Sequence, residues 1–234
     1  METLLKEYAR EIGIILTDDM IEKFIIYKNT LLEWNSKMNL TAITEEREII
    51  TKHFIDSLTI EKYIPDNARV IDVGTGAGFP GIPLKIVRND IEVVLLDSLN
   101  KRVRFLNEII RVCDLDNIIA VHGRAEDLGR QSDFREKFDI ATARAVANLA
   151  TLSEFCTPFV KIGGAFVCMK GEAEEEIKNA EKAMQELNMR LETKERLKLV
   201  GTDADRTIIV YKKSKGTPKQ YPRKAGIPAK TPIQ

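Results

Sequence analysis

The chain has few cysteines, few histidines and no long apolar run. Of its 234 residues, three are cysteine and two are histidine. Cys113, Cys156 and Cys168 are too widely spaced to form a CxxC motif, which favours buried, reduced thiols over a disulfide or a metal site. No apolar run approaches the length of a membrane span, and the N-terminus lacks the basic-then-apolar form of a signal peptide. We therefore expect a cytoplasmic globular protein with neither a metal nor a membrane partner.

The chain also lacks a net charge, because 36 basic residues balance 36 acidic ones. The balance is uneven along the sequence. Residues 212–234 hold seven basic residues, four of the eight prolines and no acid, which leaves 29 basic against 36 acidic side chains in residues 1–211. A basic, proline-rich tail on an acidic body predicts an extended arm that cannot pack a core of its own and that meets an anionic partner.

Glycines are concentrated in one segment, residues 70–81, which reads VIDVGTGAGFPG. An apolar run ends there in Asp72, and a second apolar run ends in Asp97. Four glycines follow the first acid: Gly74, Gly76, Gly78 and Gly81. Strand, glycine turn, helix, strand and acid is the pattern of a nucleotide or S-adenosylmethionine pocket. Such a turn needs glycine because its backbone takes dihedral angles closed to other residues and lies against the ligand.

The spacing of apolar residues divides the chain into three parts. Residues 1–64 have helical spacing and predict a helical extension, with one helix near 45–63. Residues 65–211 alternate between apolar runs and amphipathic segments, which predicts a parallel sheet covered on both faces. The helices expected between its strands include one near 148–160 and one near 172–187. Its last two runs predict an antiparallel pair. This order matches the doubly wound, seven-stranded α/β fold of class I S-adenosylmethionine-dependent methyltransferases, and residues 212–234 form the tail.

Three features of the glycine turn favour S-adenosylmethionine over other nucleotides. Asp72 lies at the mouth of the turn, where a carboxylate repels a pyrophosphate and attracts the ammonium and sulfonium groups of S-adenosylmethionine. Pro80 and Pro83 remove two N–H donors that a phosphate-binding loop presents. A Walker A lysine is absent, which argues against an ATPase. An NAD(P)-dependent oxidoreductase stays open, because residues 76–81 match G-x-G-x-x-G literally.

The residues resemble a known family, the bacterial small-subunit ribosomal RNA guanine-N7 methyltransferases, also called glucose-inhibited division protein B. The likeness covers nearly the whole chain, and its GFPGIP run at 78–83 is far more specific than the glycines alone. The matching segments are NLT at 39–41, HFIDS at 53–57, DVGTGAGFPGIP at 72–83, LDS at 96–98, KRVRFL at 101–106, the arginine of ARA at 143–145, MKG at 169–171 and, in part of the family, YPRKAG at 221–226.

The resemblance implies methyl transfer from S-adenosylmethionine to N7 of one guanine in 16S ribosomal RNA. It implies cofactor contacts at Gly74, Phe79, Ala125, Glu126 and Arg144. The glycine turn adds Gly76, and the broader methyltransferase pattern adds Asp97 as the acceptor for two ribose hydroxyls. For Asp97 and Glu126 alone, a helix cap or a solvated loop acid is an alternative. Guanine N7 has an in-plane lone pair, so the enzyme needs no general base and chiefly aligns the reacting atoms.

Arg144 follows the fourth predicted strand, at the edge where such folds place ligands. We expect its planar donors to hold the cofactor carboxylate, an RNA phosphate or the guanine O6. Lys170 ends the fifth strand and is a second catalytic candidate, with a solvated lysine as the alternative. His53 shares a helical face with apolar residues, so we expect a core histidine bonded to Asp56 or Asn39.

Two basic groups are candidates for contacts with RNA phosphates. One lies at the start of a predicted helix, where positive charge opposes the helix dipole: Lys101, Arg102 and Arg104. The other lies in the tail: Lys212, Lys213, Arg223 and Lys224. A solvated basic turn and a disordered terminus are the alternatives. The expected partner is 16S ribosomal RNA or the small ribosomal subunit, and a non-catalytic RNA-binding assembly protein is a further alternative.

Overall fold

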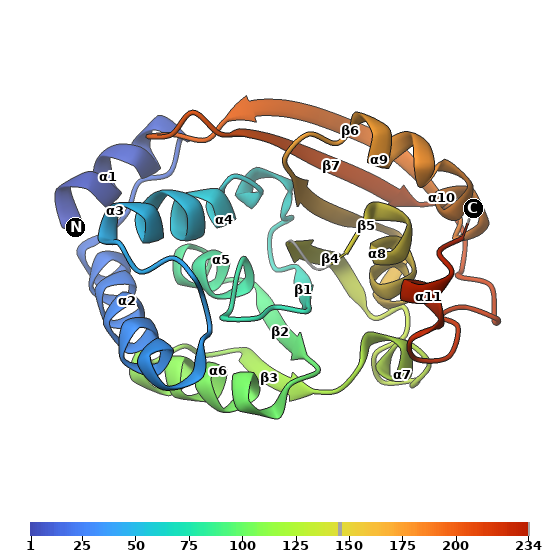
Figure 1. Cartoon of the computed structure of the whole chain (residues 1–234), viewed down its shortest axis with the longest axis horizontal. Coiled ribbons are helices and arrows are strands. Elements are labelled where there is room, and N and C mark those ends of the chain that lie inside the picture. Colours follow the sequence, from blue (N-terminus) through green and yellow to red (C-terminus); the bar gives the residue numbers. More distant parts are fainter. Residues whose placement is uncertain (145–146, 234) are drawn as a thin grey trace.

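The computed structural model describes residues 1–144 and 147–233, and its centre is a twisted sheet (Figure 1). In this part of the chain seven strands pair in the order β3-β2-β1-β4-β5-β7-β6. They are β1 (Arg69–Val73), β2 (Glu92–Asp97), β3 (Ile118–His122), β4 (Phe138–Arg144), β5 (Val160–Lys170), β6 (Met189–Lys198) and β7 (Asp205–Lys213). The first five strands are parallel, and β7 is antiparallel to both β5 and β6. The predicted fold class is confirmed.

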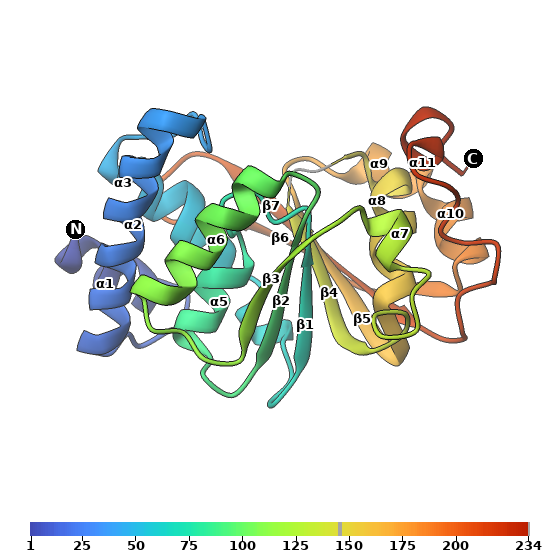
Figure 2. The ribbon, with the colours of Figure 1, turned by 90° about the horizontal axis from the view of Figure 1, so that it is seen from below.

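Helices cover both faces of the sheet (Figure 2). One face carries α1 (Glu2–Glu11), α2 (Asp18–Met38), α3 (Glu46–Glu48), η1 (Ile49–Ile55), α4 (Asp56–Leu58), η2 (Glu61–Tyr63), α5 (Gly81–Val87) and α6 (Asn100–Val112). The other carries α7 (Ala125–Leu128), α8 (Leu149–Cys156), η3 (Thr157–Phe159), α9 (Glu174–Asn179), α10 (Glu181–Glu186) and α11 (Ile227–Lys230). Neighbouring strand residues alternate between these faces, so that Val70 packs in one core and Ile71 in the other.

The N-terminal helices share one core with the sheet. Thr17 begins α2 as its N-cap, because its hydroxyl accepts a hydrogen bond from the backbone of Met20 at 3.3 Å. From α2, the ring of Phe24 packs 4.9 Å from that of Phe54, and Trp34 packs 5.8 Å from Phe105 of α6. The helical extension therefore covers the sheet directly and reaches the turn that follows β1.

Two predicted helices are interrupted. The helix expected near 45–63 consists of α3, the π-helix η1, α4 and the 3₁₀-helix η2. The helix expected over 172–187 is divided at Ala180 into α9 and α10. The helix expected over 148–160 ends at Cys156, and Pro158 follows in η3 because proline lacks the N–H that a continuing helix requires. Apolar spacing alone does not distinguish these helical variants.

The prediction of an extended C-terminal arm is wrong for residues 212–233. Strand β7 continues to Lys213, and the ring of Tyr221 is buried in the second core. The guanidinium of Arg135 donates hydrogen bonds to the carbonyl oxygens of Thr217 and Tyr221, each at 2.8 Å. A segment with few apolar residues packs here because charged side chains of the body satisfy its backbone. Composition alone carries no signal for such contacts.

Candidate functional site

The glycines of the turn have two different roles: some allow close packing, and one faces open space. A Cβ atom at Gly78 would lie 2.4 Å from Ile82 Cδ1, and one at Gly81 would lie 2.4 Å from Leu95 Cδ2. Gly76 has a φ of +64°, and a Cβ there would meet nothing within 4 Å. Gly78 and Gly81 therefore let α5 approach the sheet, whereas the backbone at Gly76 is open to a ligand.

A pocket opens beside this turn at the carboxyl ends of β1, β2 and β3. Its volume is about 270 Å³. Three predicted cofactor residues, Gly74, Ala125 and Glu126, line it. Gly226 and Ala229 line it as well, and neither was a predicted cofactor residue. The backbone N–H of Gly226 donates to Glu126 Oε1 at 2.9 Å, across 100 residues of sequence.

Asp97 ends β2 and braces the glycine turn. Its Oδ2 accepts from the backbone N–H of Gly76 at 2.9 Å, and its Oδ1 accepts from Leu99 N–H at 2.9 Å. Arg102 Nη1 lies 3.4 Å from Oδ2. A carboxylate has about four acceptor positions, so Asp97 retains acceptor capacity for a hydroxyl group.

Asp72 lies beneath the turn rather than at its open mouth, since its side chain is 0% exposed. Its Oδ2 accepts hydrogen bonds from Thr75 Oγ1 at 2.6 Å and from Gly81 N–H at 2.9 Å. Among the described residues, Asp72 Oδ1 and Thr142 Oγ1 are buried without a partner, and these two residues pair in register across β1 and β4. Burial is the main reason that the pKa of Asp72 is raised to about 6. Asp72 therefore organises the turn from below.

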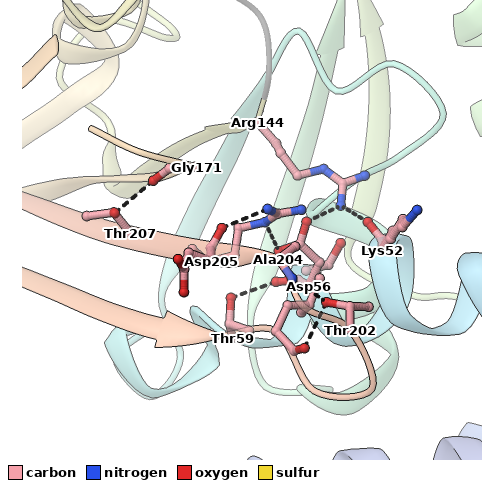
Figure 3. Close-up of polar contacts among 12 residues, drawn as sticks. Lys52, Asp56, Thr59, Arg144, Gly171, Thr202, Ala204, Asp205 and Thr207 are labelled. Carbon is pink, nitrogen blue, oxygen red and sulfur yellow. Dashed lines mark hydrogen bonds and ion pairs between the residues drawn. The ribbon is translucent and has the colours of Figure 1, made fainter. Parts of the chain in front are cut away.

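Arg144 leaves the end of β4 and crosses to the N-terminal helices (Figure 3). Its Nη1 donates to the carbonyl oxygen of Lys52 at 3.0 Å and lies 3.3 Å from Asp56 Oδ2. The second oxygen of Asp56 accepts from Arg206 Nε of β7 at 2.8 Å. Asp56 is 3% exposed, so two guanidinium groups share one buried carboxylate. The cluster of Arg144, Asp56 and Arg206, called here the arginine cluster, carries an excess of one positive charge.

Phe79 joins the glycine turn to the arginine cluster. The Arg144 guanidinium lies 4.9 Å from the centre of the Phe79 ring, a cation–π distance. The His53 ring stacks on Phe79 with centres 4.4 Å apart. The predicted cofactor contact Phe79 is therefore buried, with its ring against both Arg144 and His53 and with Tyr27 of α2 packed 5.4 Å away.

His53 is a buried residue, as predicted, but its partners differ from those expected. Arg144 Nη2 lies 3.2 Å from His53 Nδ1, and Thr41 Oγ1 lies 2.9 Å from His53 Nε2. A guanidinium only donates, so Nδ1 accepts and Nε2 carries the hydrogen. Burial, followed by the charge of Arg144, lowers the pKa of His53 to about 3. The ring is held neutral, with both nitrogens engaged.

The predicted substrate-binding cations fall into different environments. Lys170 is engaged internally, with its Nζ 2.6 Å from the carbonyl oxygen of Ala147 and 2.8 Å from Glu176 Oε2. Lys101 and Arg104 are exposed at the start of α6, at the same edge of the sheet as the glycine turn. Ala145 of the ARA segment lies outside the described residues.

Two of the four tail candidates pair with carboxylates of the protein itself. The side chain of Lys213 is 0% exposed and pairs with Glu136 at 2.8 Å. Arg223 pairs at 2.6 Å with Glu154, which is itself fully buried. In each pair one charge is buried and its partner neutralises it, as a buried charge requires. Lys212 is half-buried near the end of β7, where it pairs with Ala165 of β5, and Lys224 is exposed.

Across residues 1–144 and 147–233, no cluster of three or more histidine, cysteine, aspartate or glutamate side chains is arranged to hold a metal ion. In the same ranges no helix combines the length and apolarity needed to cross a membrane. Cys113, Cys156 and Cys168 are buried as free thiols.

A family model described as rRNA small subunit methyltransferase G, or GidB, matches residues 20–207. The chain belongs to this family. Proteins named "Ribosomal RNA small subunit methyltransferase G" are similar over full length. That of Acetivibrio thermocellus is 53% identical, covering 100% of this chain and 97% of the relative. That of Alkaliphilus oremlandii is 50% identical, covering 100% and 99%.

Solved structures with low identity share the fold. A Haloferax volcanii methyltransferase complex with the activator Trm112 gives a TM-score of 0.58 at 13% identity, covering 79% of this chain and 98% of the other. TYW2 of M. jannaschii in complex with AdoMet gives 0.55 at 16%, covering 74% and 79%. As a member of the rRNA small subunit methyltransferase G family, the chain is a methyltransferase with S-adenosylmethionine as its cofactor, as predicted. The oxidoreductase and non-catalytic alternatives are set aside.

Proposed function

We propose that the protein transfers the methyl group of S-adenosylmethionine to N7 of a guanine in 16S ribosomal RNA, in the cytoplasm. Relatives of the same length are named as methyltransferases of small-subunit ribosomal RNA. The observation that carries the proposal is the contact between the cofactor turn and the arginine cluster, because Phe79 lies 4.9 Å from the Arg144 guanidinium. A pocket for the methyl donor and a cation for an anionic substrate thus meet at one edge of the sheet.

The residues around the pocket fit S-adenosylmethionine. Open backbone at Gly76 and the pocket walls at Gly74 and Ala125 would hold the nucleoside, and the Asp97 carboxylate would accept a hydrogen bond from a ribose hydroxyl. When bound, the cofactor supplies an electrophilic methyl group. Asp72 contributes negative charge beneath the turn, which favours a ligand that carries ammonium and sulfonium groups.

Arg144 retains donors for the substrate. Among the described residues its hydrogen bonds come from Nη1 and Nη2, and a guanidinium has five N–H groups. The Nε–H therefore remains for a phosphate, the cofactor carboxylate or guanine O6. Asp56 and the backbone of Lys52 hold the guanidinium in one place, which lowers the entropy cost of binding an anion.

The chemistry at N7 fits the state of His53. Attack by the N7 lone pair needs alignment rather than proton removal. The pKa of His53 is lowered to about 3 and both its ring nitrogens are engaged, so it serves to orient Arg144 rather than as a base. The exposed cations Lys101, Arg104 and Lys224 are the phosphate contacts that we retain for the RNA, with Arg102 shared between RNA and Asp97.

The test is to locate the methyl group that the protein transfers. The protein is incubated with methyl-labelled S-adenosylmethionine and with either naked 16S ribosomal RNA or unmodified small subunits, and the RNA is digested to nucleosides for mass spectrometry. We expect the label in 7-methylguanosine, and label in any other nucleoside would refute the N7 assignment. Arg144→Ala should reduce transfer at least tenfold, whereas Arg111→Ala, on an exposed arginine paired with Glu108, should leave it unchanged.

A further inference from the structure

The C-terminal segment, residues 214–233, contacts the pocket that the glycine turn opens. Gly226 and Ala229, at the start and within α11, line this pocket together with Glu126. Helix α11 lies against α8 on the same side of the sheet as α7 (Figures 1 and 2). Residues 100 positions apart in sequence thus form two walls of one cavity.

An ion pair with a buried glutamate and several backbone contacts hold this segment in place. Arg223 donates from Nε and Nη2 to the two oxygens of Glu154 at 3.0 and 2.6 Å, and its backbone N–H donates to Glu154 Oε1 at 2.6 Å. Glu154 is buried in α8, so breaking the pair would leave an uncompensated charge. Thr151 Oγ1 of the same helix donates to the carbonyl oxygen of Pro228 at 3.2 Å. These contacts fix α11 at the rim of the pocket.

Arg223 and the neighbouring Lys213 pack this segment against the body, whereas Lys224 is exposed. Arg223 is neutralised by Glu154, and Lys213, which precedes the segment, is neutralised by Glu136. What the segment presents to the pocket is the backbone N–H of Gly226 and the methyl group of Ala229. The N–H of Gly226 is already bonded to Glu126, which leaves the apolar surface of Ala229 for a ligand.

We infer that the C-terminal segment forms the adenine end of the cofactor pocket and acts by positioning Glu126. Glu126 follows β3, where a carboxylate reads an adenine edge in the predicted cofactor arrangement. Gly226 N–H occupies Glu126 Oε1 at 2.9 Å. This bond directs the carboxylate, and Oε2 remains to accept a hydrogen bond from the N6 amino group of adenine. Ala229 and Phe155 supply apolar surface on which the ring packs.

A carboxylate positioned in this way selects for the base. The N6 amino group of adenine donates a hydrogen bond, whereas the corresponding O6 of hypoxanthine accepts one and would face the carboxylate unfavourably. A site that hydrogen-bonds a ligand group discriminates strongly against an analogue that lacks it. The segment is therefore expected to affect the choice between adenine and hypoxanthine, which a purely structural role would not change.

The experiment measures dissociation constants by calorimetry without RNA, so it does not depend on the guanine assignment. The ligands are S-adenosylmethionine, S-adenosylhomocysteine and S-inosylhomocysteine. The variants are a chain that ends at Ala225, which keeps Arg223 in place, and Ala229→Phe, which fills the pocket from α11. Lys230→Phe is the matched control, because Lys230 is exposed and does not line the pocket.

We expect both variants to weaken S-adenosylmethionine binding at least tenfold and Lys230→Phe to have no effect. The shortened chain should also lose most of the preference for S-adenosylhomocysteine over S-inosylhomocysteine, and Glu126→Ala should remove the effect of shortening. Unchanged dissociation constants in both variants would overturn the inference.

If shortening weakens RNA binding alone, the segment is an RNA arm and the inference is wrong. If the shortened chain fails to fold, the comparison of the dissociation constants of Ala229→Phe and Lys230→Phe tests the inference instead. Failure of the unaltered chain to bind S-adenosylmethionine would instead overturn the cofactor assignment itself.

Discussion

The arginine cluster gives a sharp prediction for the substitution Asp56→Asn. The carboxylate of Asp56 lies 3.3 Å from Arg144 Nη1 and 2.8 Å from Arg206 Nε, and it is 3% exposed. Asparagine keeps the shape of the side chain but removes its charge. The NH₂ group of the new amide would then face one of the guanidinium groups, and because both groups only donate hydrogen bonds, no bond would form between them. Two like charges would remain close together without the anion between them.

The expected loss of unfolding free energy depends on the hydrogen bonds that Arg144 and Arg206 retain. Removing one member of a buried ion pair costs about 3–5 kcal/mol. Arg144 keeps its bond to the carbonyl oxygen of Lys52, and Arg206 keeps one to the carbonyl oxygen of Asp205, each at 3.0 Å. We therefore expect the lower end, about 3 kcal/mol of lost free energy of unfolding. For a chain of this size that corresponds to a fall of about 6–12 °C in Tm.

Thermal and urea unfolding followed by circular dichroism measure this loss. The matched control is Asp66→Asn, since Asp66 also pairs with an arginine, Arg88, at 3.0 Å but is 93% exposed. An exposed pair contributes about 0–1 kcal/mol. If Asp56→Asn lowered the Tm no more than Asp66→Asn, the arginine cluster would not be the stabilising, positioning unit described above. At a temperature where Asp56→Asn is folded, methyl transfer should still fall, because Arg144 is no longer held.

Three further predictions concern the turn and its neighbours. Gly78→Ala should cost about 1–3 kcal/mol more than Gly76→Ala in urea unfolding, because only the added methyl at Gly78 meets a neighbour, Ile82 Cδ1 at 2.4 Å; equal costs would contradict the packing role. Burial raises the pKa of Asp72 to about 6 from its ordinary value of 3.8, so the folded state holds the proton more tightly and stability falls as pH rises from about 4 to 6. The Asp72→Asn variant lacks this titration and should not lose this stability. Between about pH 4 and 6, the unfolding free energy of the variant minus that of the unaltered protein should therefore rise by about 3 kcal/mol, and a constant difference would refute the raised pKa. The ring of His53, whose pKa is lowered to about 3, should show no NMR titration between about pH 5 and 8, and a midpoint near 6.5 would show that burial and Arg144 do not hold it neutral.

The strands and their succession along the chain could be predicted because their signals are local. Strands buried on both faces are continuous apolar runs, as in β1 and β2, and each ends in an acid, Asp72 or Asp97. The interrupted helices could not be predicted, because residues 45–63 keep an apolar spacing that α- and π-helical turns share.

The candidate site likewise has residues that the sequence identified and contacts that it did not. Gly76 and Asp97 were identifiable from their positions after strands, and the structure places them 2.9 Å apart through a hydrogen bond. Asp56 lay within a segment that resembled the family, but nothing in the sequence indicated its partners. It meets Arg144 across 88 residues and Arg206 across 150.

By itself the sequence determined the fold class, the glycine turn and the family, because these depend on residue type and spacing over short stretches. Only the tertiary structure decided where the charges lie. Arg223 was predicted to meet RNA, yet it faces Glu154 inside the protein and anchors Gly226 at the cofactor pocket. The physical reason is that a charge removed from water must find a partner, and that partner is fixed by the packing of helices and strands rather than by neighbours in the chain.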